Sequence, residues 1–196
     1  MRARMLLLAA AVVLTGAGCS GTIDATGDSG PQQSEDRTIT AASRVELATP
    51  GTLVVTTGDT PSLRVTAGKD VIGELTNEAE DGVLTLDTAR SVDEFGDVRY
   101  ELVLPSLEEL TVTGSGTITV AGSADSLAVL LEGSGNYDGT GLEGERSEVT
   151  VAGSGRADVG RTGTLVAVVE GSGTITHDRG TEVDSRIDGT GHVDAR

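Results

Sequence analysis

The chain has 196 residues, enough for one domain with a tail, and a formal net charge of −17. Nucleic acids and anionic lipid surfaces are bound through basic patches, so this charge excludes them as expected partners. Aromatic residues make up 2% of the sequence and one cysteine is present. A core must therefore be built from Val, Leu, Ile and Ala, without an intramolecular disulfide.

Residues 1–18 are predicted to be a lipoprotein signal peptide. Arg2 and Arg4 give it a basic start, and the apolar stretch over residues 5–14 follows directly. A bilayer span needs about 20 apolar residues, so this stretch is too short to cross and is typical of an export leader.

Cys19 is the predicted lipidation site. The small residues Ala17 and Gly18 precede it, an arrangement that resembles the bacterial lipobox, in which the cysteine carries the lipid and becomes the mature N-terminus. The sequence departs from that motif at Gly16, where Leu is usual. Ordinary secretory cleavage near Ala17 and an uncleaved anchor are the alternatives.

Residues 19–37 are predicted to be a flexible tether, because they are rich in Gly, Ser, Asp and Gln without an apolar period. Within them, residues 27–31 (Gly-Asp-Ser-Gly-Pro) match the segment around the nucleophile of trypsin-like serine proteases. In that family the catalytic His and Asp precede the Ser, whereas His177 and His192 follow Ser29 here. We therefore interpret the match as coincidental and predict no catalytic residues.

Residues 38–105 read as a β-rich first half of a domain that spans residues 38–196. Apolar residues alternate with polar ones in short runs, and the intervening Pro-Gly, Gly-Asp and Asp-Gly pairs favour turns. The predicted strands are Arg44–Leu47, Thr52–Thr56, Ser62–Thr66, Val83–Asp87 and Val98–Leu104. One face of each strand should be buried and the other exposed to water.

Residues 106–196 contain a repeat. Four Gly-Ser-Gly triplets and one Gly-Thr-Gly are spaced 19, 20, 18 and 18 residues apart. They are Gly114–Gly116, Gly133–Gly135, Gly153–Gly155, Gly171–Gly173 and Gly189–Gly191. A fixed period near 20 residues, with the same apolar positions in each copy, indicates a stacked repeat architecture.

The alternation of apolar residues continues through the triplet. Leu110, Val112, Gly114 and Gly116 share one parity, which predicts that both glycines point inward at a corner too tight for a Cβ, with Ser115 outward. A three-residue hairpin loop would give the same parity. Two all-β architectures therefore fit, a parallel β-solenoid and an antiparallel hairpin stack, and the near-constant period favours the solenoid.

Over residues 38–196 the chain resembles the head GIN domain of auto-transporter adhesins, a domain of bacterial envelope proteins. The resemblance rests on the β-rich first half, residues 103–107 (Val-Leu-Pro-Ser-Leu), the repeated triplets and the terminal residues 189–193 (Gly-Thr-Gly-His-Val). It implies a right-handed parallel β-helix, and it carries no established activity.

Asp138 and Asp158 are candidate metal ligands, because each lies three residues after its triplet. Rungs of a solenoid are about 4.8 Å apart, and two carboxylates at that distance repel each other unless a cation or another partner intervenes. Asn136 would add an oxygen ligand to such a site, whereas Arg156 would neutralise it without metal.

Other chemistry finds little support. Phosphate-binding glycine loops need a following helix and usually a lysine, and the one lysine is Lys69. His177 and His192 occupy nearly equivalent positions of neighbouring copies without a third ligand, so they read as surface residues. Polysaccharide-processing enzymes need a groove in which sugars stack on aromatic side chains, which this composition disfavours.

The leading hypothesis is a non-enzymatic, adhesin-like scaffold or interaction domain, extracytoplasmic and anchored to the bacterial cell membrane through Cys19, with an unidentified envelope component as partner and no cofactor. The alternatives are an ion- or small-ligand-binding module and a carbohydrate-active enzyme. The predicted recognition residues flank the triplets: Glu132, Asn136, Asp138, Arg156 and Asp158. The first half should cover one end of the solenoid, and self-association through the other end is left open.

Overall fold

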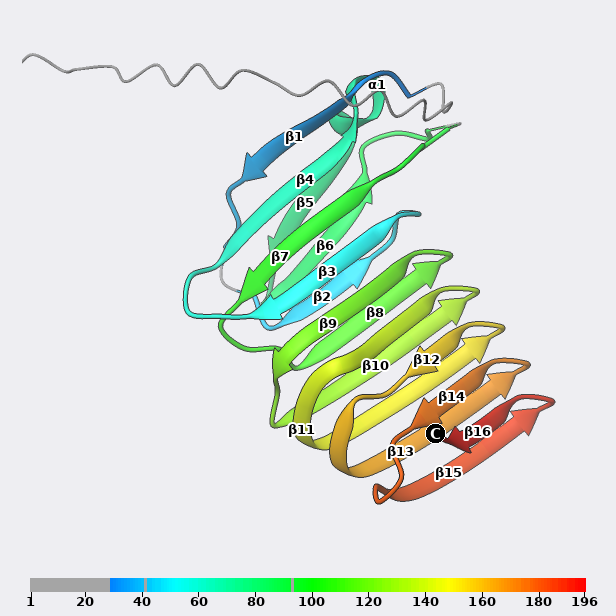
Figure 1. Ribbon diagram of the computed structural model, residues 1–196. Coiled ribbons are helices and arrows are strands. Elements are labelled where there is room, and N and C mark those ends of the chain that lie inside the picture. Colours follow the sequence, from blue (N-terminus) through cyan, green and yellow to red (C-terminus); the bar gives the residue numbers. More distant parts are fainter. Residues whose placement is uncertain (1–28, 41, 93) are drawn as a thin grey trace, which may run out of the picture.

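The computed structural model describes residues 29–40, 42–92 and 94–196. In these residues, 16 β-strands and one four-residue helix form an elongated stack (Figure 1). Most strands come in pairs joined at a sharp corner, and we call each such pair a rung. The rungs lie one above another, so their strands build two facing sheets.

The first sheet contains the strands that precede each corner. They are β6 (Val83–Thr88), β2 (Arg44–Leu47), β8 (Glu109–Gly114), β10 (Ser126–Gly133), the second half of β11 (Asn136–Gly153), β13 (Arg161–Gly171) and β15 (Glu182–Gly189). The second sheet contains the strands that follow each corner. They are β7 (Arg99–Leu104), β3 (Thr52–Thr57), β9 (Thr117–Ser123), the first half of β11, β12 (Arg156–Asp158), β14 (Thr174–His177) and β16 (His192–Ala195).

Neighbouring repeats pair in parallel, with one triplet directly above the next. Gly133 pairs with both Gly114 and Gly153, and the same register continues to Gly171 and Gly189. This parallel pairing confirms the β-solenoid and shows that the hairpin stack is wrong. It also explains the near-constant period, because equivalent residues of neighbouring rungs must stay in register, and the small differences in spacing fall between the paired segments, as between Asp138 and Gly141.

The core is a set of vertical columns of apolar side chains between the two sheets. One column runs through Val112, Leu131, Val151 and Val169, all fully buried, and reaches Ile187 in the last rung. Burying one Val, Leu or Ile side chain contributes about 1.5–3 kcal/mol, so each rung is stabilised mainly by the rungs above and below it.

The two glycines of each triplet have different roles, which corrects the prediction that both point inward. The first glycine is outside the core and adopts positive φ, from 106° at Gly114 to 142° at Gly153 and Gly189. The second is buried, and a Cβ on Gly135 would lie 2.6 Å from the side chain of Val112. The second glycine is therefore needed for its small size. The first is needed for its conformation and, from Gly133 onward, also because a Cβ would meet the carbonyl oxygen of the glycine in the preceding rung.

The first half of the domain does not follow the order of the chain. After β2 and β3, the chain leaves the stack through β4 (Ser62–Gly68), α1 (Lys69–Ile72) and β5 (Leu75–Glu80), then returns as β6 and β7. Because β2 pairs with both β6 and β8, and β3 with both β7 and β9, the rung of β2 and β3 lies between the rung of β6 and β7 and the rung of β8 and β9. Strand alternation predicted β2, β3, β4, β6 and β7, but α1 and β5 were missed.

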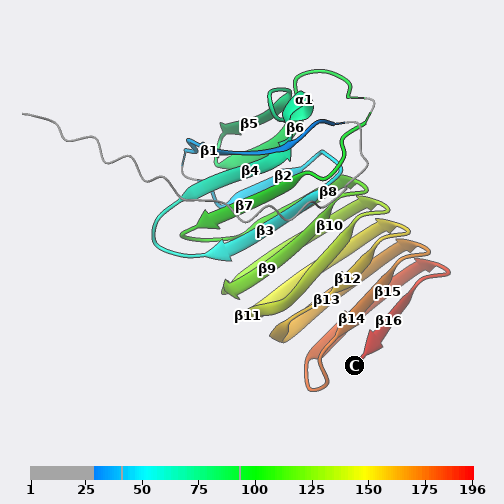
Figure 2. The same cartoon turned by 45° about the horizontal axis from the view of Figure 1, so that its top comes forward.

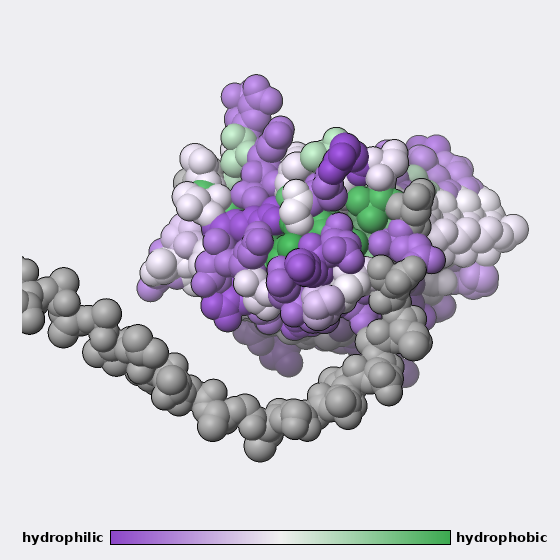
Figure 3. Space-filling model, turned by 90° about the horizontal axis from the view of Figure 1, so that it is seen from above, coloured by the Kyte–Doolittle hydropathy of each residue, from purple (hydrophilic) through white to green (hydrophobic). Residues whose placement is uncertain are grey.

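The N-terminal end of the solenoid is covered, as predicted. β4 adds antiparallel to β7, β5 adds antiparallel to β6, and α1 lies across the end with Val71 and Ile72 buried (Figures 1 and 2). The mostly buried side chain of Arg37 donates hydrogen bonds to the carbonyl oxygens of Leu75 and Ile72, the latter at 2.6 Å. Seen from above, this end is largely hydrophilic around a small hydrophobic area (Figure 3).

The predicted tether overlaps a strand, which is a correction to its boundary at residue 37. β1 (Gln32–Arg37) pairs antiparallel with β4, and Ser29 is buried with its carbonyl accepting a hydrogen bond from the Asp70 amide. Alternation could not reveal β1 because nearly all of its side chains are exposed and it is held by backbone pairing. The signal peptide and Cys19 lie outside the described residues.

Candidate interaction surface

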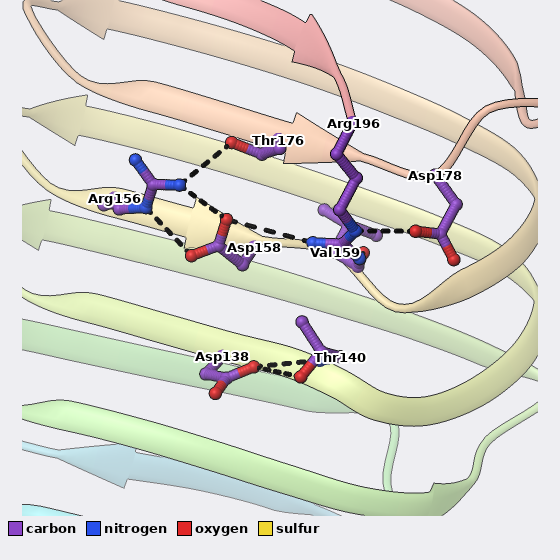
Figure 4. Close-up of polar contacts among 8 residues, drawn as sticks. All are labelled: Asp138, Thr140, Arg156, Asp158, Val159, Thr176, Asp178 and Arg196. Carbon is purple, nitrogen blue, oxygen red and sulfur yellow. Dashed lines mark hydrogen bonds and ion pairs between the residues drawn. The ribbon is translucent and has the colours of Figure 1, made fainter.

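The predicted metal ligands are brought together on the outer face of the second sheet. Asp138 of β11 lies in register beside Asp158 of β12, and both side chains are half-buried. Asp138 accepts hydrogen bonds from the Thr140 amide at 3.0 Å and from the Thr140 hydroxyl at 2.7 Å (Figure 4). One oxygen of this carboxylate therefore already has two donors.

Asp158 is held by arginines. The Arg156 guanidinium donates two hydrogen bonds of 2.9 Å to its two oxygens (Figure 4). These bonds, supported by the Arg156 charge, keep the pKa of Asp158 below its usual range despite partial burial. Arg196 lies 3.9 Å from the same carboxylate, and it also bonds Asp178 at 2.6 Å.

This cluster links rungs rather than enclosing a ligand. Arg196 donates a further hydrogen bond of 2.6 Å to the Val159 carbonyl, so the segment after β16 is tied to the segment after β12. Beyond the aspartate pair, the next in-register residues are Thr119 and Thr176. In the described part of the chain, no group of three or more His, Cys, Asp or Glu residues is placed to hold a metal ion.

The other predicted recognition residues are divided between two faces. Asn136 lies in register with Arg156 on the second sheet, whereas Glu132 pairs with Thr113 and Ala152 on the first. The five residues therefore do not form one surface. The sequence repeat could not show this, because the corner between Glu132 and Asn136 turns the chain from one sheet to the other.

The two histidines are not equivalent, contrary to the prediction. His192 pairs with Thr174, and His177 pairs with Ala195 at the other end of the same strand pair. His177 is half-buried and its Nδ1 lies 2.9 Å from the Asp178 carbonyl oxygen. His177 lies four residues after Gly173, whereas His192 lies one residue after Gly191, and this difference of three residues places them in different columns.

A groove of about 740 Å³ lies on the outer face of the second sheet near its N-terminal end. It runs over β4, β7 and β3, where the outward side chains of Val54 and Val103 give it an apolar floor. Arg64 and Glu101 line it beside Val54, and Asp36 bonds Arg64 at 2.8 Å. Sequence reasoning missed this groove, although valines at outward positions of alternating strands were a signal.

The fold and this surface define a parallel β-solenoid whose outer faces carry polar side chains and a partly apolar groove. Residues 43–123 and 109–180 match the family model described as "Putative auto-transporter adhesin, head GIN domain". These matches together cover more than half of the chain, and the chain belongs to this family.

Several solved structures are similar to the chain. One described as "a putative adhesin" from Bacteroides fragilis is 16% identical, covers 85% of this chain and 97% of its own, and has a TM-score of 0.48. A "putative adhesin" from Parabacteroides distasonis is 20% identical, with 87% and 98% covered and a TM-score of 0.42. A "putative cell adhesion protein" from Clostridium sporogenes is 9% identical, with 84% and 98% covered and a TM-score of 0.36. A search of curated proteins finds no match.

Across the described ranges, no helix has the length and apolar character that a membrane crossing requires.

Proposed function

We propose that this protein is a non-enzymatic, adhesin-like binding domain that works outside the cytoplasm. Family membership supports the adhesin-like role and the extracytoplasmic location. The leader over residues 1–18 and the motif that ends in Cys19 support anchoring of the protein to the bacterial membrane through a lipid.

The groove over β4, β7 and β3 is the observation that carries the binding role. Its volume falls in the range typical of ligand sites, about 300–1,000 Å³. Val54 and Val103 offer apolar contact, while Arg64 and Glu101 offer charges of both signs at its side. An extended segment of another envelope protein fits this combination, because an apolar floor binds side chains and a mixed-charge side favours one orientation.

Site-specific photo-crosslinking in intact cells tests this proposal. We expect a crosslinker placed at Val103 to give one discrete product with an envelope component. The same crosslinker at Thr174, which lies on the same sheet several rungs away from the groove, should give none. Equal products at both positions, or none at Val103, would contradict a binding role for the groove.

The anchor has its own test. We expect Cys19→Ala to release the protein from the membrane fraction into the medium, because no lipid can then be attached. Unchanged retention of the variant in washed membranes would show that Cys19 does not anchor the protein.

A divalent-ion module is the second candidate function, favoured by the in-register pair of Asp138 and Asp158. The bonds from Thr140 and Arg156 weigh against it, because a hard cation would have to displace an arginine that already neutralises the pair.

A further inference from the structure

The last rung, formed by β15 and β16, has one side uncovered. Among the described strands, β15 pairs with β13 alone and β16 with β14 alone. Ile187 is 44% exposed, whereas Val169, its in-register neighbour, is fully buried. Val183 and Val193 are also only partly buried. The apolar core therefore reaches the surface at this end.

The same side carries free backbone positions. In each earlier rung the carbonyl of the first glycine accepts a bond from the next rung, as when the Ser154 amide donates to Gly133 at 2.8 Å. Gly189 occupies this position in the last rung, so its carbonyl points away from β13. Backbone groups alternate in direction along a strand, so the carbonyl groups of Ile187, Ser185 and Val183 also point away from β13. An edge with such unpaired backbone groups is a template for another strand.

The side chains of β15 are complementary to a second β15 in antiparallel orientation. When the pairing is centred on Ser185, Asp184 faces the second copy's Arg186, and Arg186 faces its Asp184. On the inward side, Val183 faces the second copy's Ile187, and Ile187 faces the second copy's Val183. Directly opposite residues lie about 4.5–5.5 Å apart at Cβ, so both charge pairs and both apolar pairs are in contact.

Neighbouring registers are less favourable. A shift of the centre to Asp184 or to Arg186 also keeps inward residues opposite inward ones, but it places Asp184 opposite Asp184 or Arg186 opposite Arg186 on the axis and separates Val183 from Ile187. In the favoured register Glu182 faces Asp188, and Arg186 already pairs with Asp188 of its own strand at 2.6 Å. The register centred on Ser185 is thus the one that brings Val183 opposite Ile187 while Asp184 faces Arg186.

β16 fits the same symmetry. Ser185 lies four residues before Gly189, and Ala195 lies four residues after Gly191. Both are therefore equally far from the corner, and one two-fold axis serves both strands. Around Ala195, the backbone pairing would extend over Asp194, Ala195 and Arg196, while the Arg196 side chain keeps its bonds to Asp178 and Val159 of its own chain. A symmetric interface of this kind uses the same patch on both molecules.

We propose that this end binds a second copy of the chain, end to end, through antiparallel pairing of the two β15 strands and of the two β16 strands. β1 and α1 lie at the opposite end of the solenoid (Figures 1 and 2), so the N-terminal ends of such a dimer point away from each other. With the anchor at Cys19, which is part of the proposed function, copies on two facing membranes can meet through this contact.

Sedimentation of the full chain with Cys19→Ser tests the contact in a charge-exchange design. The parent protein should form a dimer, and Asp184→Arg and Arg186→Asp should each lower the association constant at least about tenfold, because like charges then face each other. Mixing the two variants should restore the dimer, since two arginines then face two aspartates. The control Glu148→Arg makes the same charge change on the same outward column, two rungs away, and should leave the dimer intact.

Covalent trapping tests the register. Ser185→Cys in the Cys19→Ser background should form an intermolecular disulfide under mild oxidation, since the two cysteines would face each other across the axis. Ser126→Cys, at the exposed start of β10, should not. A parent protein that stays monomeric, variants that do not complement each other, or equal trapping at both positions would overturn the proposal.

Vesicles separate this inference from the proposed function. Neutral phosphatidylcholine vesicles carrying the lipidated parent chain should cluster, and vesicles carrying Asp184→Arg should cluster only when mixed with those carrying Arg186→Asp. If no clustering occurs while the Val103 crosslink forms, end-to-end contact is refuted and the binding role of the groove stands. If clustering occurs without that crosslink, the groove proposal fails and the end-to-end contact stands.

Discussion

At the N-terminal end of the solenoid, α1 and β5 bury Val71, Ile72 and Leu75, whereas at the C-terminal end Ile187 is 44% exposed. Both ends of a stacked β-sheet present the same problem, because the last strand has unpaired backbone groups and a half-covered core. One end is solved within the chain by antiparallel strands and a helix. The difference shows where this molecule has room for a partner that continues its sheets.

The largest predicted effect is the difference in stability lost when an aspartate replaces an apolar residue at each of the two ends. Ile72→Asp should lower the free energy of unfolding by about 4 kcal/mol or prevent folding, because it buries an unpaired charge. Ile187→Asp in dilute solution should cost only about 1 kcal/mol, since its side chain reaches solvent. Chemical denaturation of both variants measures this, and similar losses would contradict the contrast between a closed and an open end.

The stability cost of replacing the first glycine of a triplet should depend on how closely the preceding rung packs against it. Gly114→Ala should cost about 1 kcal/mol, because its φ is 106° but nothing lies within 4 Å of a Cβ. Gly153→Ala should cost about 3 kcal/mol, because its Cβ would also overlap the Gly133 carbonyl oxygen. Melting temperatures rank the two. Equal losses would mean that backbone conformation alone, without stacking, sets the need for glycine.

Buried tyrosines should make both halves sensitive to alkali. Burial raises the pKa of Tyr137, helped by the Asp138 charge, and burial also raises the pKa of Tyr100, whose hydroxyl lies 3.2 Å from that of Thr49. The pKa of a tyrosine in the unfolded chain is about 10. When folding raises this pKa, the resulting stability is fully present at pH values below about 10 and is lost as the pH rises through the pKa of the folded state.

Melting between pH 9 and about 11.5 measures this loss. Tyr137→Phe should remove more of the alkaline decline than Tyr100→Phe, because the shift at Tyr137 is the larger one. An alkaline decline that is the same in both variants and the parent would show that neither phenol is responsible.

Calcium should have the smallest effect. We expect no change in melting temperature at millimolar calcium, because Arg156 already neutralises Asp158. Asp138→Asn serves as the matched control, since it removes one of the two carboxylates. A rise of about 5 °C or more in the parent, absent in Asp138→Asn, would instead support the ion-binding function.

Much of the repeat region follows from its sequence, because the main inward columns repeat apolar residues at a near-constant spacing. The parity of Leu110 and Val112 places their side chains correctly. Parity could not distinguish the roles of the two glycines in a triplet, because a positive φ and a lack of space for a side chain both require glycine. The in-register pairing of Asp138 and Asp158 was also predictable once the rungs were parallel.

The first half was less predictable, for two physical reasons. β1 carries almost no buried side chains, so backbone pairing with β4 and the contacts of Arg37 leave no apolar period in the sequence. The insertion of β2 between β6 and β8 depends on long-range pairing that no local pattern encodes. Arg196 was missed at the candidate site because it reaches Asp158 from two rungs away.

Amide hydrogen exchange of the full chain with Cys19→Ser, followed at several protein concentrations, tests the central claim most directly. The account predicts that amides of β15 and β16 exchange quickly in dilute solution and slowly at high concentration, while those of β4, β5 and α1 do not change. Exchange of β15 and β16 that does not depend on concentration, or a concentration effect at the N-terminal end instead, would contradict a solenoid closed at one end and completed by a second copy at the other.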